Sequence, residues 1–271
     1  MKSKYSLLLA LQSFDYEITR LCSYAKECED CYELLQVKLD DLCRYIMCEG
    51  NDLVWKRWGE HPEIRRHGEQ LRSTSNQALC ELEKHQSMRL LERKESLTEY
   101  LAMLSASVKR ELRDYELHSG SRVLFVGSGA LPLSALTIAR ETGAEVLCLD
   151  IDEEAVRIGS MVAEAGGLRD RVRFSGSYVE GLAFAEQATH VIVASLVESK
   201  HEVLKTFRPA IRSDAAVILR YGHGLKSVFN YPLDGDFGTD WHTASFGRSD
   251  CVYDTVMLKA KSGGRSEVRS G

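Results

Sequence analysis

Long apolar runs are missing from this sequence of 271 residues. A helix that crosses a bilayer needs about 20 apolar residues in succession, and no run comes close, so we expect no membrane-spanning segment. An excess of positive charge is also missing, because 35 Lys and Arg residues stand against 40 Asp and Glu residues, for a net charge of −5. That balance predicts no nucleic-acid partner.

Several catalytic and metal-binding signatures are missing as well. The sequence has no HExxH motif or comparable histidine cluster and no nucleophile elbow, which predicts neither metal catalysis nor a Ser/His/Asp enzyme. Its one close cysteine pair, Cys28 and Cys31, lies in a helical pattern and has no second pair at zinc-site spacing, so we expect free thiols and no bound metal.

Nothing at the N-terminus predicts export. Residues 5–11 are apolar, but no small-residue cleavage site follows them, so we interpret the stretch as the start of an amphipathic helix rather than a signal peptide. The eight cysteines are scattered along the chain, which suits a reducing compartment better than a disulfide framework. We therefore expect a cytoplasmic protein.

Glycine and proline are scarce before residue 120, and the apolar residues there recur at helical intervals. Leu35, Leu39, Leu42 and Ile46 are spaced by three or four residues, which is typical of one buried helix face. The expected breaks lie at 49–52, 61–62 and 67–68, and further helices at 73–91 and 96–115. We predict an all-helical domain over residues 1–118.

After residue 120, short apolar runs alternate with helical segments. This alternation is typical of a parallel sheet with helices on both faces. The expected strands are 122–126, 145–149, 172–174, 190–193, 216–219 and 251–258, and the clearest helices are 133–142 and 153–165. We predict an α/β domain over residues 119–261, followed by a disordered Gly/Ser-rich tail over residues 262–271.

The loop after the first expected strand carries the strongest ligand signal. Gly127, Ser128 and Gly129 follow that strand, and glycine lets the backbone approach a ligand closely. Asp150 ends the second strand, where a carboxylate can accept hydrogen bonds from both hydroxyls of a ribose. Because ligands of doubly wound sheets bind at the carboxyl ends of the strands, the pattern predicts an adenosine-containing ligand.

The loop favours S-adenosylmethionine over a dinucleotide. The dinucleotide fingerprint needs a small residue three positions after Gly129, where this sequence has Pro132. Proline suits the first turn of a helix but does not give the close helix–strand packing that glycine allows. A sulfonium nucleoside carries no phosphate and needs no such cradle.

Three segments, taken in order, resemble the nicotianamine synthase family. Residues 126–134, VGSGALPLS, resemble the G-x-G-x-(L/Y)-P-(L/M) loop of these enzymes. Residues 194–200, ASLVESK, are similar to the segment after the family's fourth strand. Residues 219–226, LRYGHGLK, followed by FNYP at 229–232, are similar to the segment after its fifth strand. In detail the segments look most like the bacterial branch that makes opine metallophores of the staphylopine and pseudopaline type.

The resemblance implies a Rossmann-like, methyltransferase-type sheet with a helical N-terminal domain over the active site. It also implies that an amine attacks the γ-carbon of the aminobutyrate arm of S-adenosylmethionine, so that methylthioadenosine leaves. In the bacterial branch the acceptor is free histidine, which gains one aminobutanoyl unit. An opine dehydrogenase would act next, and no metal is needed by the enzyme itself.

The resemblance also assigns residues. Glu83 is the best match for the family's functional glutamate, with Glu81 as a competitor, and Tyr100 is the best match for a tyrosine that follows it. The expected nucleoside contacts are Gly127, Ser128, Gly129, Leu131, Pro132, Asp150, Ile151, Ser177, Tyr178 and Ser195. Arg220, Tyr221 and Tyr231 are expected to bind the substrate, with Arg220 at a strand end pairing a carboxylate.

Two other functions fit the same sheet. A small-molecule N-methyltransferase would use the same ligand but release S-adenosylhomocysteine, and a true nicotianamine synthase would use other amines. A third alternative is a non-catalytic interaction module. The predicted helices of residues 1–118 have exposed apolar faces, which favours a homodimer. The hand of the histidine acceptor stays open.

Overall fold

The computed structural model describes residues 1–93, 108–109, 111–112, 114–233, 235, 237, 241–246 and 251–261. The predicted catalytic Tyr100 and the predicted disordered tail, 262–271, lie outside these ranges. No helix in the described ranges is both long enough and apolar enough to cross a membrane.

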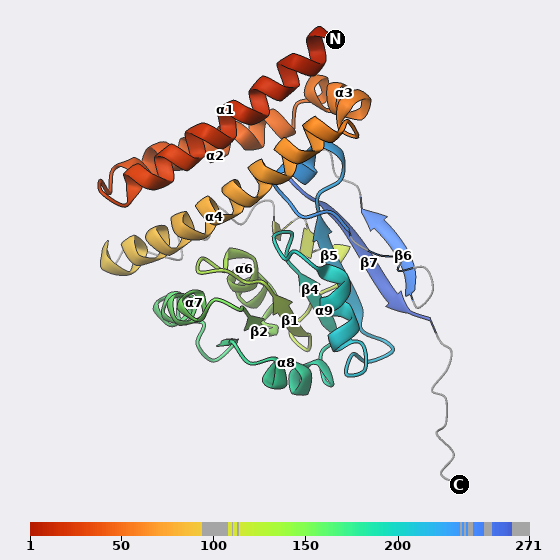
Figure 1. Ribbon diagram of the computed structural model, residues 1–271. Coiled ribbons are helices and arrows are strands. Elements are labelled where there is room, and N and C mark those ends of the chain that lie inside the picture. Colours follow the sequence, from red (N-terminus) through yellow and green to blue (C-terminus); the bar gives the residue numbers. More distant parts are fainter. Residues whose placement is uncertain are drawn as a thin grey trace.

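Four helices form a layer over one end of the sheet (Figure 1). They are α1 (Lys2–Ala25), α2 (Cys31–Ile46), α3 (Glu49–Trp58) and α4 (Pro62–Arg93). Their shared core includes Leu11, Leu35, Leu42, Ile64 and Leu71, all fully buried. Within this layer, α4 lies nearest the sheet and α1 farthest from it (Figure 1).

Some predicted helix breaks are wrong. Glu49 begins α3, so residues 49–52 start a helix, and the break itself falls just before them. The expected turn at His67 and Gly68 lies inside α4. Gly68 is there for close packing, since an added Cβ would stand 3.0 Å from the Trp55 ring and 3.4 Å from Val228.

The position of the cysteine pair also differs from the prediction. Cys28 lies in the turn between α1 and α2, and Cys31 is the first residue of α2. None of the eight cysteines, all of which lie in the described ranges, forms a disulfide bond.

A seven-stranded sheet follows, in the order β3-β2-β1-β4-β5-β7-β6. Its strands are β1 (Arg122–Val126), β2 (Glu145–Leu149), β3 (Val172–Ser175), β4 (His190–Val193), β5 (Ala216–Tyr221), β6 (Trp241–Phe246) and β7 (Asp254–Ala260). The first five are parallel, as predicted. The prediction of a wholly parallel sheet is wrong at one edge, because β7 pairs antiparallel with both β5 and β6.

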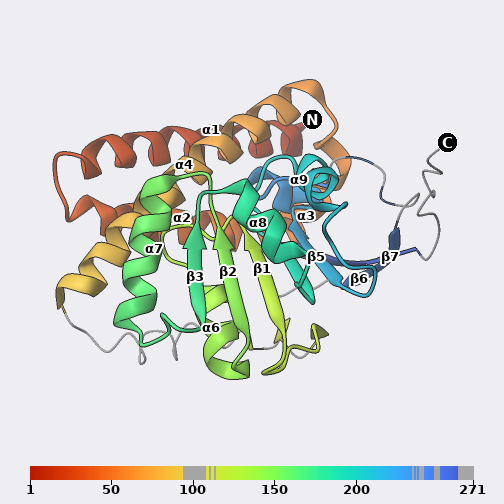
Figure 2. The same ribbon diagram turned by 90° about the horizontal axis from the view of Figure 1, so that it is seen from below.

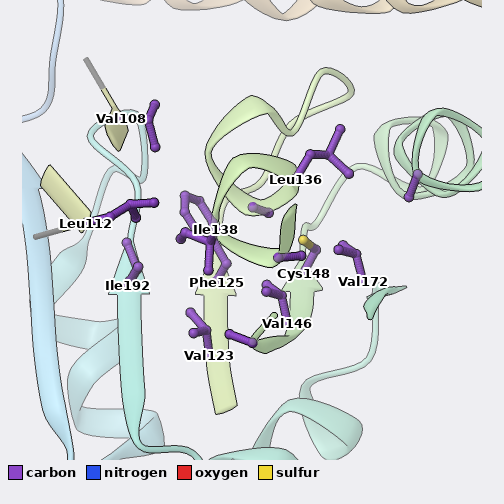
Figure 3. Packing of buried hydrophobic residues seen from close by; sticks show 14 of the residues in the cluster. Val108, Leu112, Val123, Phe125, Leu136, Ile138, Val146, Cys148, Val172 and Ile192 are labelled. Atoms are coloured by element: carbon purple, nitrogen blue, oxygen red, sulfur yellow. The ribbon is translucent and has the colours of Figure 1, made fainter. Parts of the chain in front are cut away.

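Helices cover both faces of the sheet. One face packs on α6 (Leu133–Thr142) and α7 (Glu153–Ala165), through side chains such as Leu136, Ile138 and Val162. Figure 3 shows this cluster, in which Val108 and Leu112 also pack against the strands. The other face packs on α8 (Tyr178–Ala185) and α9 (Lys200–Phe207). A short 3-10 helix, η1 (Gly224–Val228), follows β5 and packs into the core of the helical layer.

Candidate active site

The loop after β1 turns sharply at its two glycines. Gly127 and Gly129 have φ angles of +79° and +67°, a region that glycine enters at no steric cost. A Cβ on Gly127 would collide with Val197, and one on Gly129 would collide with the Glu83 carboxylate. The loop ends at Pro132, which caps the N-terminus of α6. Both positions therefore favour glycine by backbone conformation, and a Cβ at either would force a neighbouring side chain to move.

Asp150 ties this loop to the end of β2. Its Oδ2 accepts a hydrogen bond from the Gly129 N–H at 2.8 Å, and its Oδ1 accepts one from the Asp152 N–H at 3.0 Å. The N–H groups of Gly127 and Ser128 donate to the Leu149 carbonyl. A carboxylate oxygen has more than one lone pair, so both oxygens of Asp150 can still accept from ribose hydroxyls. These hydrogen bonds tie the predicted ribose acceptor to the loop after β1 and to the residue that precedes α7.

Two exposed side chains with apolar surface, Ile151 and Tyr178, follow β2 and β3. Ile151 is 87% exposed, although aliphatic side chains are usually buried. After β3, Ser177 accepts a hydrogen bond from the Glu180 N–H as the cap of α8, and Tyr178 stacks on Phe207. Ile151 and Tyr178 therefore offer apolar surface at the strand ends, where an adenine ring is expected.

Three polar side chains of α4 hold the helix across these strand ends. Ser87 donates from Oγ to the Ala130 carbonyl at 2.9 Å. Lys84 forms ion pairs with Asp152 at 2.7 Å and Glu154 at 2.8 Å. Near the other end of α4, Arg72 donates to the Ser227 carbonyl at 2.7 Å. The helix thus runs from the loop after β5 to the loops after β1 and β2. Figure 2 shows β2 and β3 pointing toward this helical layer.

Glu83 on α4 reaches the glycine loop. Its carboxylate accepts hydrogen bonds from the backbone N–H groups of Leu131 and Ala130. Burial, and then the nearby charge of Asp150, raise the pKa of this carboxyl to about 8, although the two N–H donors oppose the shift. A carboxyl poised near neutral pH can exchange protons at the pH where enzymes work.

Glu81, the competing glutamate, lies on a different side of α4. Residues two positions apart on a helix do not share a face, and the charge of Glu81 is felt by Cys22 and Tyr32 in α1 and α2. Of these two glutamates, Glu83 is the one that lies at the glycine loop.

Ser195 is held by a buried lysine that we did not predict as a site residue. The Ser195 carbonyl accepts from the Tyr231 N–H at 3.0 Å and from Lys200 Nζ at 3.1 Å. Lys200 is fully buried and also donates to the carbonyls of Val197 and Tyr231. It thereby joins the loop after β4 to the segment after η1. The Tyr231 ring in turn faces the Arg72 guanidinium, 5.0 Å from its centroid.

Arg220 meets a carboxylate of the protein itself. At the end of β5 its guanidinium is buried and pairs with Glu111 at 2.8 Å, while it also donates to Ser134 at 2.9 Å. Glu111 accepts a further hydrogen bond from the Tyr253 hydroxyl at 2.6 Å. The neighbouring Tyr221 points to the opposite face and packs on the α9 side of the sheet. The geometry therefore gives both residues structural contacts, and their predicted substrate contacts stay predictions.

The predicted site residues in the described ranges lie at the carboxyl ends of the parallel strands or on α4. Most follow β1, β2, β3 or β4, whereas Arg220 and Tyr221 end β5 and Tyr231 follows η1. Sequence reasoning missed Lys84, Ser87, Lys200 and Glu111. Ser87 could have been found as the residue one helical turn after Glu83, whereas Glu111 gives no local signal.

The sequence is similar to one known family over most of its length. The family model described as nicotianamine synthase protein matches residues 35–264. A protein of Pseudomonas aeruginosa (strain UCBPP-PA14) named L-histidine 2-aminobutanoyltransferase is 41% identical over 259 residues, which cover 96% of this chain and 98% of that protein. A Yersinia pestis protein of the same name is 30% identical over 267 residues, covering 94% and 96% of the two chains.

A solved structure shares the fold. The crystal structure of MtNAS in complex with MTA and tNA has a TM-score of 0.74 to this chain, covering 92% of it and 97% of MtNAS. At 17% sequence identity, the similarity shows that the whole arrangement of helical layer and sheet is common to both.

Proposed function

The chain belongs to the nicotianamine synthase family, and we propose that it transfers the 2-aminobutanoyl group of S-adenosylmethionine to the α-amine of L-histidine. The observation that carries the proposal is the 41% identity, over 96% of the chain, to an enzyme named L-histidine 2-aminobutanoyltransferase. The L-form is favoured because the relatives from both Pseudomonas aeruginosa and Yersinia pestis bear that name. The product is the histidine intermediate of an opine-type metallophore.

The site residues support this chemistry. Gly127, Gly129 and Asp150 provide a glycine loop and a ribose acceptor, and Ile151 and Tyr178 offer apolar surface for adenine. We assign further nucleoside contacts to Ser128, Leu131, Pro132, Ser177 and Ser195, as predicted. The chain needs no phosphate cradle for this ligand, which agrees with Pro132 in place of the third glycine.

The reaction is a displacement at carbon. The neutral α-amine of histidine attacks the γ-carbon of the aminobutyrate arm, and a carbon–nitrogen bond forms while the carbon–sulfur bond breaks. The electron pair of that bond stays on sulfur, so neutral methylthioadenosine leaves. The sulfonium activates all three of its carbons, so the enzyme's contribution is to hold the amine in line with one of them.

Glu83 is the proposed proton acceptor. The nitrogen that attacks becomes positively charged and must lose a proton, and the Glu83 carboxylate lies beside the loop that holds the sulfonium nucleoside. Its pKa of about 8 without ligand falls when a sulfonium binds nearby, because an opposite charge favours the ionised carboxylate. Binding of S-adenosylmethionine thus favours the ionised form of Glu83 that accepts the proton. Tyr100 is predicted to assist.

The nucleoside product tests the proposal. Transfer of the aminobutanoyl group releases methylthioadenosine, whereas an N-methyltransferase releases S-adenosylhomocysteine. Chromatography of a reaction containing purified protein, S-adenosylmethionine and L-histidine separates the two. Methylthioadenosine formed only when histidine is present is the expected result.

Three predictions about cellular context accompany this function. The enzyme works in the cytoplasm, and an opine dehydrogenase consumes its product, which still carries a free amine able to condense with a keto acid. A homodimer is also expected, because Tyr5, Leu9 and Tyr16 on α1 are 51%, 65% and 67% exposed and share one helix face. Light scattering of the purified protein measures the oligomeric state directly.

A further inference from the structure

The side chain of Asn76 is buried and unpaired. Asn76 lies in the middle of α4 and is only 8% exposed. In the described part of the chain, neither its Nδ2 nor its Oδ1 has a hydrogen-bond partner. A buried amide without partners destabilises the fold, so native proteins rarely keep one without a reason. A ligand that supplies the missing partners is such a reason.

Asn76 faces the active site. It follows Arg72 by four residues and precedes Glu83 by seven, and on a helix with 3.6 residues per turn these spacings put the three side chains on one face. Arg72 donates to Ser227 after β5, and Glu83 contacts Gly129 after β1. The face between them therefore looks toward the strand ends.

The opposite face of α4 packs into the helical layer through other residues. Leu71, Ala78 and Leu82 point into the core of the helical layer. Ser75 is also fully buried, but its hydroxyl donates to the Leu71 carbonyl at 2.7 Å. Asn76 is about 100° around the helix from Ser75, so the packing of α1 and α2 does not explain its polar group.

The position of Asn76 points to the acceptor rather than the nucleoside. Apart from Ser195, the proposed nucleoside residues follow β1, β2 and β3, whereas Asn76 lies on the part of α4 that leads to Arg72 and the loop after β5. Two helical turns, about 10 Å, separate its Cα from that of Glu83. A histidine with its α-amine at Glu83 extends about 6 Å to its far ring nitrogen, over five bonds of about 1.5 Å. Hydrogen bonds of about 3 Å at each end of the histidine span the remaining distance.

We propose that Asn76 binds the imidazole ring of the acceptor histidine. A neutral imidazole has one N–H donor and one acceptor nitrogen, and an amide offers both a donor and an acceptor, so Asn76 can pair with either tautomer. This assignment rests on the proposed function and adds a residue that selects histidine over other amino acids. A site built to hydrogen-bond a substrate strongly rejects analogues that lack the matching group.

The test replaces Asn76 by leucine, which has a similar volume and no polar atoms. Binding of L-histidine to protein saturated with methylthioadenosine is measured by calorimetry, so that no turnover occurs. The Asn76→Leu variant should bind histidine at least tenfold more weakly while its affinity for methylthioadenosine stays within twofold. Its Tm without ligand should rise, because an unpaired buried amide has been removed. The control Ser75→Ala, one residue earlier on the other face, should leave histidine binding unchanged.

Acceptor preference gives a second readout. The ratio of kcat/KM for L-histidine to that for L-phenylalanine should fall at least tenfold in Asn76→Leu, since only histidine loses a hydrogen bond. If this variant does not fold, Asn76→Ser keeps the position polar and small but lacks the amide, and the same losses are expected.

The outcomes separate the inference from the function on which it rests. Unchanged histidine binding in Asn76→Leu overturns the assignment and leaves the proposed function standing. Weaker binding of methylthioadenosine or S-adenosylmethionine, with histidine unaffected, overturns it too and makes Asn76 part of the nucleoside site. A wild-type enzyme that binds no histidine overturns both.

Discussion

The carboxylate of Glu83 occupies the space that a Cβ atom on Gly129 would need. The helical layer and the nucleoside loop therefore touch at the point where the reaction is proposed to occur. Asp150 fixes Gly129 from the other side through its N–H group. The proposed base and the proposed ribose acceptor thus both lie against Gly129.

Replacement of Gly129 by alanine should nearly abolish activity. The added methyl group pushes Glu83 aside and strains a backbone with φ near +67°, which costs an L-residue about 1–2 kcal/mol. We expect kcat/KM for S-adenosylmethionine to fall more than 100-fold in steady-state kinetics. Gly167→Ala is the matched control, because Gly167 has φ of +69° and nothing within 4 Å of the added atom. Equal activity losses in both variants would mean that strain, and not the contact with Glu83, is responsible.

Glu83→Gln should separate chemistry from binding. The amide keeps the shape of the side chain but cannot take a proton, so turnover should fall more than tenfold while S-adenosylmethionine binds nearly as before. Glu81→Gln removes a carboxylate from another side of the same helix and should leave turnover within about twofold, as expected for a change away from the reacting groups. Turnover unchanged in Glu83→Gln would rule out Glu83 as the base.

Binding of S-adenosylmethionine should release a proton. With its pKa raised to about 8, Glu83 is mostly protonated at pH 7 in the free enzyme. The sulfonium lowers this pKa, so binding expels close to one proton, and affinity should rise as the pH increases from about 6 to 8 and then level off. Calorimetry in buffers of different ionisation enthalpy counts the protons. Neutral methylthioadenosine should release fewer, and Glu83→Gln should release almost none. A proton count that does not change in Glu83→Gln would assign the release to another group.

The buried pair of Arg220 and Glu111 should matter mainly for stability. Glu111→Gln leaves the Arg220 charge without its carboxylate in a site only a few percent exposed, which costs about 3–5 kcal/mol. The exposed pair of Arg212 and Asp214 is the control, and Asp214→Asn should cost less than about 1 kcal/mol. Urea unfolding of both variants measures the difference. Similar values for the two would mean that the buried pair is no stronger than a surface one.

Local features of this chain could be predicted well. The strands over 122–126, 145–149 and 190–193 were predicted with their observed limits, because each is a short apolar run next to a glycine or a polar residue. The glycine loop and Asp150 were predicted for the same reason, since each is fixed by the strand directly before it. Features that depend on contacts between distant residues were predicted less well. Gly68 indicated a turn in the sequence, and only the Trp55 ring packed against it explains why the helix continues.

Contacts between distant segments could not be predicted. Nothing near residue 220 shows that Glu111 pairs with Arg220, and nothing near residue 76 shows that the Asn76 amide is buried without a partner. The edge strand β6 was missed because its stability comes from pairing with β7, and a segment of this kind has a weak pattern of its own. Tertiary packing thus decides whether a side chain such as Arg220 or Asn76 makes a structural contact or is available to a substrate.

The central claim is that histidine receives the aminobutanoyl group. Mass spectrometry of one reaction tests it, with S-adenosylmethionine carrying carbon-13 either in its aminobutyrate arm or in its methyl group, and with L- or D-histidine as acceptor. The account predicts an L-histidine adduct heavier by one aminobutanoyl unit that carries label only from the aminobutyrate arm. An adduct that carries the methyl label, with S-adenosylhomocysteine as the second product, would contradict it.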